Sequence, residues 1–185
     1  HPYYQKAFPV RARDVAKAKA LLKEAGVSGP VSVDFMVPKG AETEAVSQVI
    51  QSMAAETGFD MKIRVTEFAT SLKQAEAGEY QAYMLAWSGR IDPDGNSYVF
   101  LKTGAPQNYS SWSNADADKA LDDARLVTEQ AKRKAIYENM TKVVLDEHPI
   151  LYIFHRRILI AHTKKLQGYK QMPDGLVRVV GLTLK

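Results

Sequence analysis

Aromatic, basic and acidic side chains follow one another closely in one short run, at Trp87, Arg90, Asp92 and Asp94. An indole offers a flat stacking surface, and a guanidinium grips a carboxylate through two parallel N–H bonds. The run follows an apolar segment of strand length, residues 80–87, and Gly89, Pro93 and Gly95 then interrupt regular structure. We predict that Trp87 stacks on a ligand while Arg90 and Asp92 recognise its charge. The plainer interpretation is a core aromatic beside a surface ion pair of Arg90 with Asp92 or Asp94.

Three further polar side chains are candidates for hydrogen bonds to the same ligand: Asn108, Tyr109 and His155. The alternative for Asn108 and Tyr109 is that they brace the Trp87 loop, and for His155 a half-buried histidine bonded to backbone.

No metal and no cofactor is predicted. His148, His155 and His162 recur at an odd spacing, which puts alternate members on opposite faces of a strand. The Asp92 run resembles a calcium loop only superficially, because Thr103 stands where a bidentate Glu is needed. Turn chemistry explains its aspartates.

The surrounding elements alternate between strand and helix. Asp14 is predicted to cap a helix that ends at Gly26. The following elements are a strand at 31–37, a helix at 42–57, a strand at 61–68, a helix from Thr70 to Gly78, a strand at 80–87, helices at 115–127 and 129–147 with Thr128 as a cap, a long bent strand or hairpin over 150–161, a turn at 172–175 and an alternating segment at 176–180. This order predicts an α/β fold, a layered mixed sheet flanked by helices in a single domain.

Several stretches together carry a resemblance to a known family. They are the 80–96 run, residues 14–26, residues 108–125 and residues 149–155. In order and spacing they resemble the solute-binding proteins of peptide/nickel-type ABC importers, through nearly the whole chain. The resemblance implies one lobe, residues 1–185, of a two-lobed periplasmic receptor, matching the C-terminal half of such proteins. Residues 1–10 and 172–185 are then expected near the hinge or between the lobes.

What the resemblance implies about function is a receptor that closes two lobes around a peptide or peptide-like solute. The expected partners are that solute, the missing N-terminal lobe and the permease of an ABC importer. Family members that bind free peptides pair an acidic side chain near this position with the ligand's ammonium group, whereas this sequence has Arg90. The departure favours a carboxylate or another anion as the ligand group.

Composition excludes several other classes. The chain has no cysteine, so it has no disulfide, no thiolate metal site and no cysteine nucleophile. Its 25 basic and 21 acidic residues are interleaved, and its basic clusters at 132–134 and 155–157 lack interleaved aromatics, which argues against nucleic acid. No apolar run reaches the length of a membrane span, and the first residues are not a signal peptide.

An enzyme is not expected, since no nucleophile motif or phosphate loop is present. Two alternatives to a solute receptor remain: a hydrolase or transferase that uses Asp92 and Asp94, and a module that docks a protein partner.

Overall fold

The computed structural model describes residues 1–172 and 174–185, and these fall into two compact units. The first unit holds residues 1–87 and 104–111, and the second holds residues 88–103 and 112–185. The sequence predicts a single lobe, and its assignment to residues 1–185, with hinge segments at both ends, stays a prediction. Each unit has a buried core of its own.

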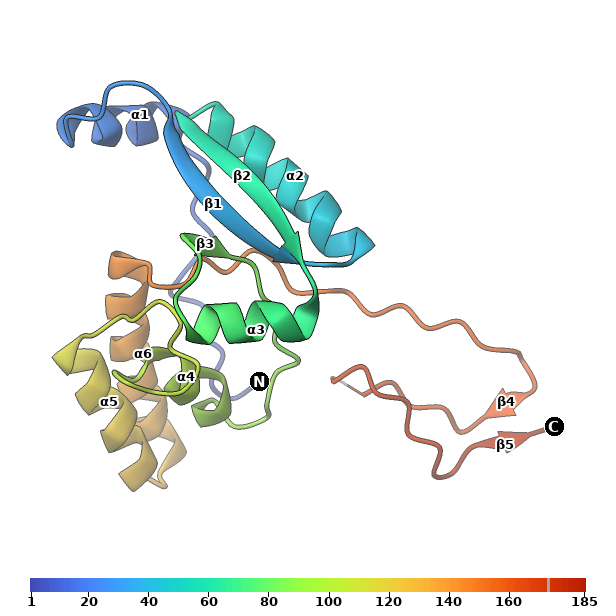
Figure 1. The fold of residues 1–185 in the computed structure, drawn as a ribbon. Coiled ribbons are helices and arrows are strands. Elements are labelled where there is room, and N and C mark those ends of the chain that lie inside the picture. Colours follow the sequence, from blue (N-terminus) through green and yellow to red (C-terminus); the bar gives the residue numbers. More distant parts are fainter. Residues whose placement is uncertain (173) are drawn as a thin grey trace. The chain divides into compact units, whose positions relative to one another are not determined.

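A parallel sheet forms the centre of the first unit. Strand β1 (Val31–Pro38) pairs with β2 (Phe59–Thr66) in register from Val31 opposite Phe59 to Pro38 opposite Thr66, and with β3 (Ala82–Tyr83) on its other side. Helix α2 (Ala41–Ala55) crosses between β1 and β2 and packs on both, and α3 (Phe68–Glu76) contacts β1 (Figure 1). The predicted α/β fold class is confirmed.

The core of the first unit lies on the second half of β1. Phe35, Met36 and Val37 are at most 5% exposed, because β1 is the central strand. A central strand of a parallel sheet is covered on both faces, so its apolar residues are consecutive and do not alternate.

Helix α1 (Val15–Glu24) begins and ends as its sequence predicts. The Asp14 carboxylate accepts a hydrogen bond from Lys17 N at 2.8 Å, which confirms the predicted cap. Gly26 has φ +72°, a conformation that favours glycine, just past the helix end.

The predicted strand over residues 80–87 is wrong in length, since β3 holds only Ala82 and Tyr83. One further bond, Met84 N to Met36 O at 3.0 Å, continues toward the end of β1. The next residue of β1 that faces β3 is Pro38, which has no N–H to donate, so the ladder stops there.

Three helices form the core of the second unit: α4 (Asp94–Leu101), α5 (Ala115–Leu126) and α6 (Gln130–Glu147). Their buried residues include Leu101, Leu121, Ala124, Tyr137 and Val144. Helix α4 corrects the sequence prediction, which expected only a loop after Pro93. Proline suits a helix start and Asp94 complements the positive end of the helix dipole.

The predicted helices at 115–127 and 129–147 are confirmed within two residues at each end. Thr128 is not the cap between them, however. The residue at the cap position of α6 is Glu129, and its side chain makes no capping hydrogen bond.

The C-terminal segment differs most from its prediction. The described residues 150–161 and 176–180 form neither helix nor strand, because no hydrogen-bonded neighbouring strand lies along them in this part of the chain. A short antiparallel pair instead joins β4 (Leu166–Gln167) to β5 (Thr183–Leu184). The turn predicted at 172–175 includes Pro173, which lies outside the described residues; Gly175 N donates to Met172 O at 3.0 Å.

Among the helices of the described residues, none combines the length and the apolar character that crossing a membrane requires.

Candidate ligand-binding site

Arg90 lies in a closed turn of the second unit, residues 88–96, which we name the Arg90 turn. The Asn96 side chain holds both backbone groups of Arg90: its Oδ1 accepts from Arg90 N at 2.7 Å, and its Nδ2 donates to Arg90 O at 2.7 Å. Arg90 Nη1 donates to Gly89 O at 2.8 Å and to Ser88 Oγ at 3.2 Å. The Arg90 side chain is exposed on the surface of this unit.

Gly95 makes the turn compact. A Cβ at this position would lie 2.9 Å from Arg90 Cγ, closer than real Cβ atoms approach, and 3.0 Å from Arg90 Cβ. The aliphatic part of Arg90 therefore packs directly on the backbone of the next helix, α4.

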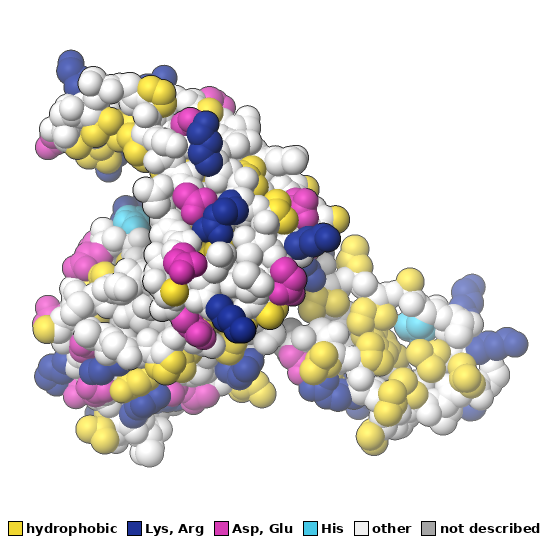
Figure 2. All heavy atoms as spheres, viewed as in Figure 1, with side chains coloured by type: hydrophobic (Ala, Val, Ile, Leu, Met, Phe, Trp, Pro, Cys, Tyr) yellow, Lys and Arg dark blue, Asp and Glu magenta, His cyan; other side chains and the backbone are white. Residues whose placement is uncertain are grey.

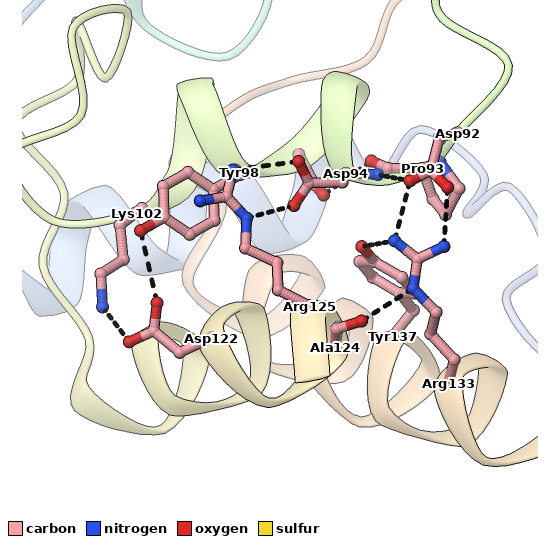
Figure 3. Close-up of polar contacts among 11 residues, drawn as sticks. Asp92, Pro93, Asp94, Tyr98, Lys102, Asp122, Ala124, Arg125, Arg133 and Tyr137 are labelled. Atoms are coloured by element: carbon pink, nitrogen blue, oxygen red, sulfur yellow. Dashed lines mark hydrogen bonds and ion pairs between the residues drawn. The ribbon is translucent and has the colours of Figure 1, made fainter. Parts of the chain in front are cut away.

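Asp92 does not pair with Arg90. Its carboxylate accepts two hydrogen bonds from Arg133 of α6, Nη1 to Oδ2 at 2.7 Å and Nη2 to Oδ1 at 2.8 Å (Figure 3). Oδ1 also accepts from Asp94 N at 2.9 Å. The surface ion pair that the sequence suggested inside the turn is thus an ion pair between the turn and a distant helix.

Asp94 makes a second bidentate pair, with Arg125 of α5: Nε to Oδ1 at 2.7 Å and Nη2 to Oδ2 at 2.9 Å. The Arg125 guanidinium carbon lies 3.2 Å from the centre of the Tyr98 ring. Beyond it, Lys102 Nζ donates to Asp122 at 2.7 Å (Figure 3). These contacts fasten α4 along α5.

The ion pairs shift the pKa of Asp92 and of Arg125. Hydrogen bonds from Arg133 lower the pKa of Asp92 below the ordinary value of 3.8, against a smaller opposing effect of burial. The hydrogen bonds to Asp94 likewise raise the pKa of Arg125. Asp92 is therefore ionised near neutral pH, and its negative charge is paired with the positive charge of Arg133. Its role in binding a ligand stays a prediction; the alternative is that it only holds the turn to α6.

In the first unit, three tyrosines gather around the segment that leads to Trp87. The Tyr83 ring lies 5.6 Å from that of Tyr80 and 6.3 Å from that of Tyr109, measured between ring centres. The Tyr80 hydroxyl donates to the backbone carbonyl of Tyr109, and burial raises the pKa of all three phenols, so they stay neutral. Trp87 follows them with 41% of its surface exposed, outside the packed core.

Asn108 and Tyr109 take part in the local structure of the 104–111 loop. Ser110 Oγ donates to Asn108 Oδ1 at 3.0 Å, and the loop backbone closes a turn from Asn108 N to Ala105 O at 3.0 Å. These contacts are local to the loop, and Tyr109 also contacts Tyr80 and Tyr83, in the segment that leads to Trp87. Whether Asn108 and Tyr109 contact a ligand or brace the Trp87 loop stays a prediction.

His155 lies exposed in the segment of the second unit that forms neither helix nor strand. In the described residues no three His, Cys, Asp or Glu side chains gather as a metal ion would require. The candidates thus divide between the units: Trp87, Asn108 and Tyr109 belong to the first, and Arg90, Asp92 and His155 to the second.

Arg133, Arg125 and Asn96 are the important residues that sequence reasoning missed. Arg133 lies in the basic cluster at 132–134, whose pattern argues against nucleic acid and gives no partner for its charges. Two arginines on successive helices, facing the aspartates of a Pro-containing turn, were the available signal, but sequence does not show which charges meet.

The fold is that of the periplasmic binding proteins. A putative peptide binding protein, AppA, from Clostridium difficile superposes with a TM-score of 0.87, covering 99% of this chain and 40% of that one at 21% identity. The periplasmic binding protein DppA from Helicobacter pylori, in complex with the peptide STSA, superposes with a TM-score of 0.71 at 28% identity, covering 80% of this chain and 30% of that one.

Sequence comparison identifies the family of this chain within the periplasmic binding proteins. Residues 1–109 match the model of bacterial extracellular solute-binding proteins, family 5 Middle. The dipeptide-binding protein of Escherichia coli is 32% identical over 171 residues, which are 88% of this chain and 32% of that protein. Di/tripeptide-binding protein 1 of Pseudomonas aeruginosa is 29% identical over an equal length, with the same coverage of both chains. This chain therefore belongs to the family 5 extracellular solute-binding proteins, and it spans about a third of the length of these relatives.

Proposed function

We propose that this chain is part of a solute-binding receptor that delivers a peptide or peptide-like solute to an ABC importer. Membership of a family of binding proteins supports the receptor role, and the named relatives bind dipeptides and tripeptides. Their class also supports a location outside the cytoplasmic membrane, in the periplasm, with a permease as partner.

The solute contact that the geometry supports best is a carboxylate or another anion on Arg90. The carrying observation is that the Arg90 side chain is exposed while Asn96 holds its backbone on both sides. A guanidinium held in this way can form the two-pronged bond that carboxylates favour.

Trp87 is proposed as a stacking surface for the solute, because its ring is partly exposed and follows a cluster of packed tyrosines. Asn108, Tyr109 and His155 remain candidates for hydrogen bonds. For Asp92 we favour the structural role, since both carboxylate oxygens already accept hydrogen bonds.

A further lobe of the same protein is proposed as the partner of the C-terminal segment. Figure 2 shows hydrophobic side chains gathered over the part that carries β4 and β5. Leu159, Val179 and Val180 are each more than 70% exposed. Exposed apolar residues gathered in this way are typical of a surface that another polypeptide covers. A protein-docking module would expose such a surface as well, and the two differ in whether the covering polypeptide belongs to the same chain.

The test is calorimetric titration of the full-length receptor with L-alanyl-L-alanine and with its C-terminal amide. We expect the free carboxylate to bind more tightly, and Arg90→Gln to weaken that binding by about 10 to 100 fold, the usual effect of losing a charged hydrogen bond. Lys132→Gln, which removes an exposed charge of α6, is the matched control. Equal affinity of both ligands for the unaltered receptor would remove the carboxylate assignment.

We propose that the protein is a binding protein and not an enzyme. The contacts of the two carboxylates on which the enzyme alternative depends support this proposal. Asp92 and Asp94 are each bound by an arginine, and the pKa of Asp92 is lowered, so that residue is a poor proton donor at neutral pH.

A further inference from the structure

The contact between Asp92 and Arg133 joins the Arg90 turn to the rest of the second unit. Arg133 uses both terminal nitrogens of its guanidinium on the two carboxylate oxygens of Asp92, at 2.7 and 2.8 Å. Planar, two-pronged contacts of this kind fix orientation as well as distance. The carboxylate therefore cannot rotate without breaking at least one charged hydrogen bond.

Arg133 is itself held from two sides. Its Nε donates to the backbone oxygen of Ala124 in α5 at 2.8 Å, and its guanidinium lies 5.4 Å from the centre of the Tyr137 ring (Figure 3). Only 14% of the Arg133 side chain is exposed, compared with 57% for Asp92. Arg133 is thus held in place by α5 and α6, and Asp92 binds to an arginine whose position the helices already fix.

Contacts within the turn connect Asp92 to Arg90 through Asn96 and Gly95. The Asp92 backbone oxygen accepts from Asn96 Nδ2 at 3.3 Å and from Gly95 N at 3.2 Å. Asn96 in turn holds the backbone of Arg90, and Gly95 lies against its aliphatic stem. A shift of Asp92 would therefore displace the two residues that orient Arg90.

We propose that Arg133 is a positioning residue for solute recognition: through Asp92 it holds the Arg90 turn in the conformation that presents the Arg90 guanidinium to the anionic group of a solute. The inference rests on the proposed function of Arg90. It goes further by assigning a part in specificity to Arg133, a residue of α6 that acts on Arg90 through Asp92 and Asn96.

Two measurements on the full-length receptor test the inference. The first is amide hydrogen exchange of Arg90 and Asp94 in Arg133→Gln, with Lys132→Gln as the matched control on the same helix. We expect exchange at both amides to become about tenfold faster in Arg133→Gln and to be unchanged in the control, with β1 equally protected in both.

The second measurement is the ratio of affinities for L-alanyl-L-alanine and its C-terminal amide. We expect Arg133→Gln to lose most of the preference for the free carboxylate, as Arg90→Gln does, and the double variant to lose no more than Arg90→Gln alone. A merely structural role for Arg133 would lower thermal stability without changing this ratio.

The outcomes separate the two proposals. If Arg90→Gln removes the preference and Arg133→Gln keeps it, the positioning role is wrong while the function of Arg90 stands. If the unaltered receptor has no preference, the carboxylate assignment fails, and exchange at Arg90 still decides whether Arg133 holds the turn. Unchanged exchange in Arg133→Gln overturns the inference whatever the ligand.

Discussion

The charged residues of the Arg90 turn have two different roles: its aspartates form ion pairs with helices, and Arg90 is the proposed contact for the solute. Asp92 and Asp94 are bound by arginines of α6 and α5, whereas the Arg90 side chain is exposed. Ion pairs at a surface contribute little to stability on their own, about 0 to 1 kcal/mol each. Their main effect here is to fix the geometry of the Arg90 turn.

Acid conditions test the Asp92 pair. Because the pKa of Asp92 is lowered in the folded protein, its contribution to stability is present above the unfolded value near 3.8 and is lost as pH falls through the folded value. Asp92→Asn should therefore reduce the free energy of unfolding near neutral pH and make its fall below about pH 4 less steep.

Urea unfolding at a series of pH values measures this effect. Asp34, whose pKa is lowered by Arg64 in the first unit, keeps its own contribution in the Asp92→Asn variant, so part of the slope must remain. An identical slope in the variant and the unaltered protein would contradict the assigned pKa shift.

Gly95 gives a second test at the scale of one residue. Replacing it by alanine places a methyl group 2.9 Å from Arg90 Cγ, so the Arg90 stem must move. We expect Gly95→Ala to destabilise the protein by about 1 to 3 kcal/mol and to change the chemical shift of Arg90 Nε–H. The control is Ala105→Gly, in the 104–111 loop. Gly104→Ala is not suitable, because Gly104 has φ +72°, a conformation that strains a residue with a Cβ. An unchanged Arg90 signal would show that the contact is relaxed without cost.

At the scale of elements, α5 and α6 are joined at one end by a small polar cluster. The Asn114 side chain caps α5 by accepting from Asp116 N and Ala117 N, each at 3.0 Å, and donates to Glu147 at 2.7 Å. Trp112 Nε1 donates to the other oxygen of Glu147 at 2.6 Å. The start of α5 is thereby attached to the end of α6.

Removing the cap tests how much this cluster stabilises the helices. Asn114→Ala should lower the free energy of unfolding by about 1 kcal/mol or slightly more, since it removes a cap and one hydrogen bond to a carboxylate. Denaturant unfolding measures the change, and Ser113→Ala, one residue before the cap, is the control. A loss equal to that of the control would mean that the cap contributes nothing.

At the scale of the whole molecule, two compact cores contrast with an extended C-terminal segment. The cores bury residues such as Met36 and Leu121, which are at most 1% exposed. Residues 150–161, by contrast, leave Leu151, Tyr152 and Leu159 more than 60% exposed and form neither helix nor strand. Exposed backbone without regular hydrogen bonds opens easily to solvent and to proteases.

Limited digestion of this chain by trypsin tests that contrast. We expect early cleavage after Arg156 or Arg157, and much slower cleavage after Lys132 and Lys142, which are exposed but lie in α6. Mass spectrometry of the first fragments identifies the cut. Equal rates at both places would contradict the assignment of residues 150–161 as the less protected segment.

Much of the architecture was predictable because it depends on local patterns. The capping aspartate Asp14, the alternating helices and strands up to Glu76 and the two later helices follow from side-chain periodicity and from turn residues, which act over a few positions. The strand at 80–87 was overestimated because its length depends on whether β1 offers a donor at Pro38. Propensity within the segment carries no information about that neighbour.

The sequence by itself determined the fold class, the family resemblance and the candidate residues Trp87 and Arg90, because residue types and their spacing are written along the chain. Only the tertiary structure decided that Asp92 pairs with Arg133 and Asp94 with Arg125, and that Asn96 holds Arg90. The physical reason is that ion pairs and hydrogen bonds depend on distance and direction in space. Asp92 and Arg133 are far apart in sequence, and only the packing of α4, α5 and α6 brings them within 2.7 Å.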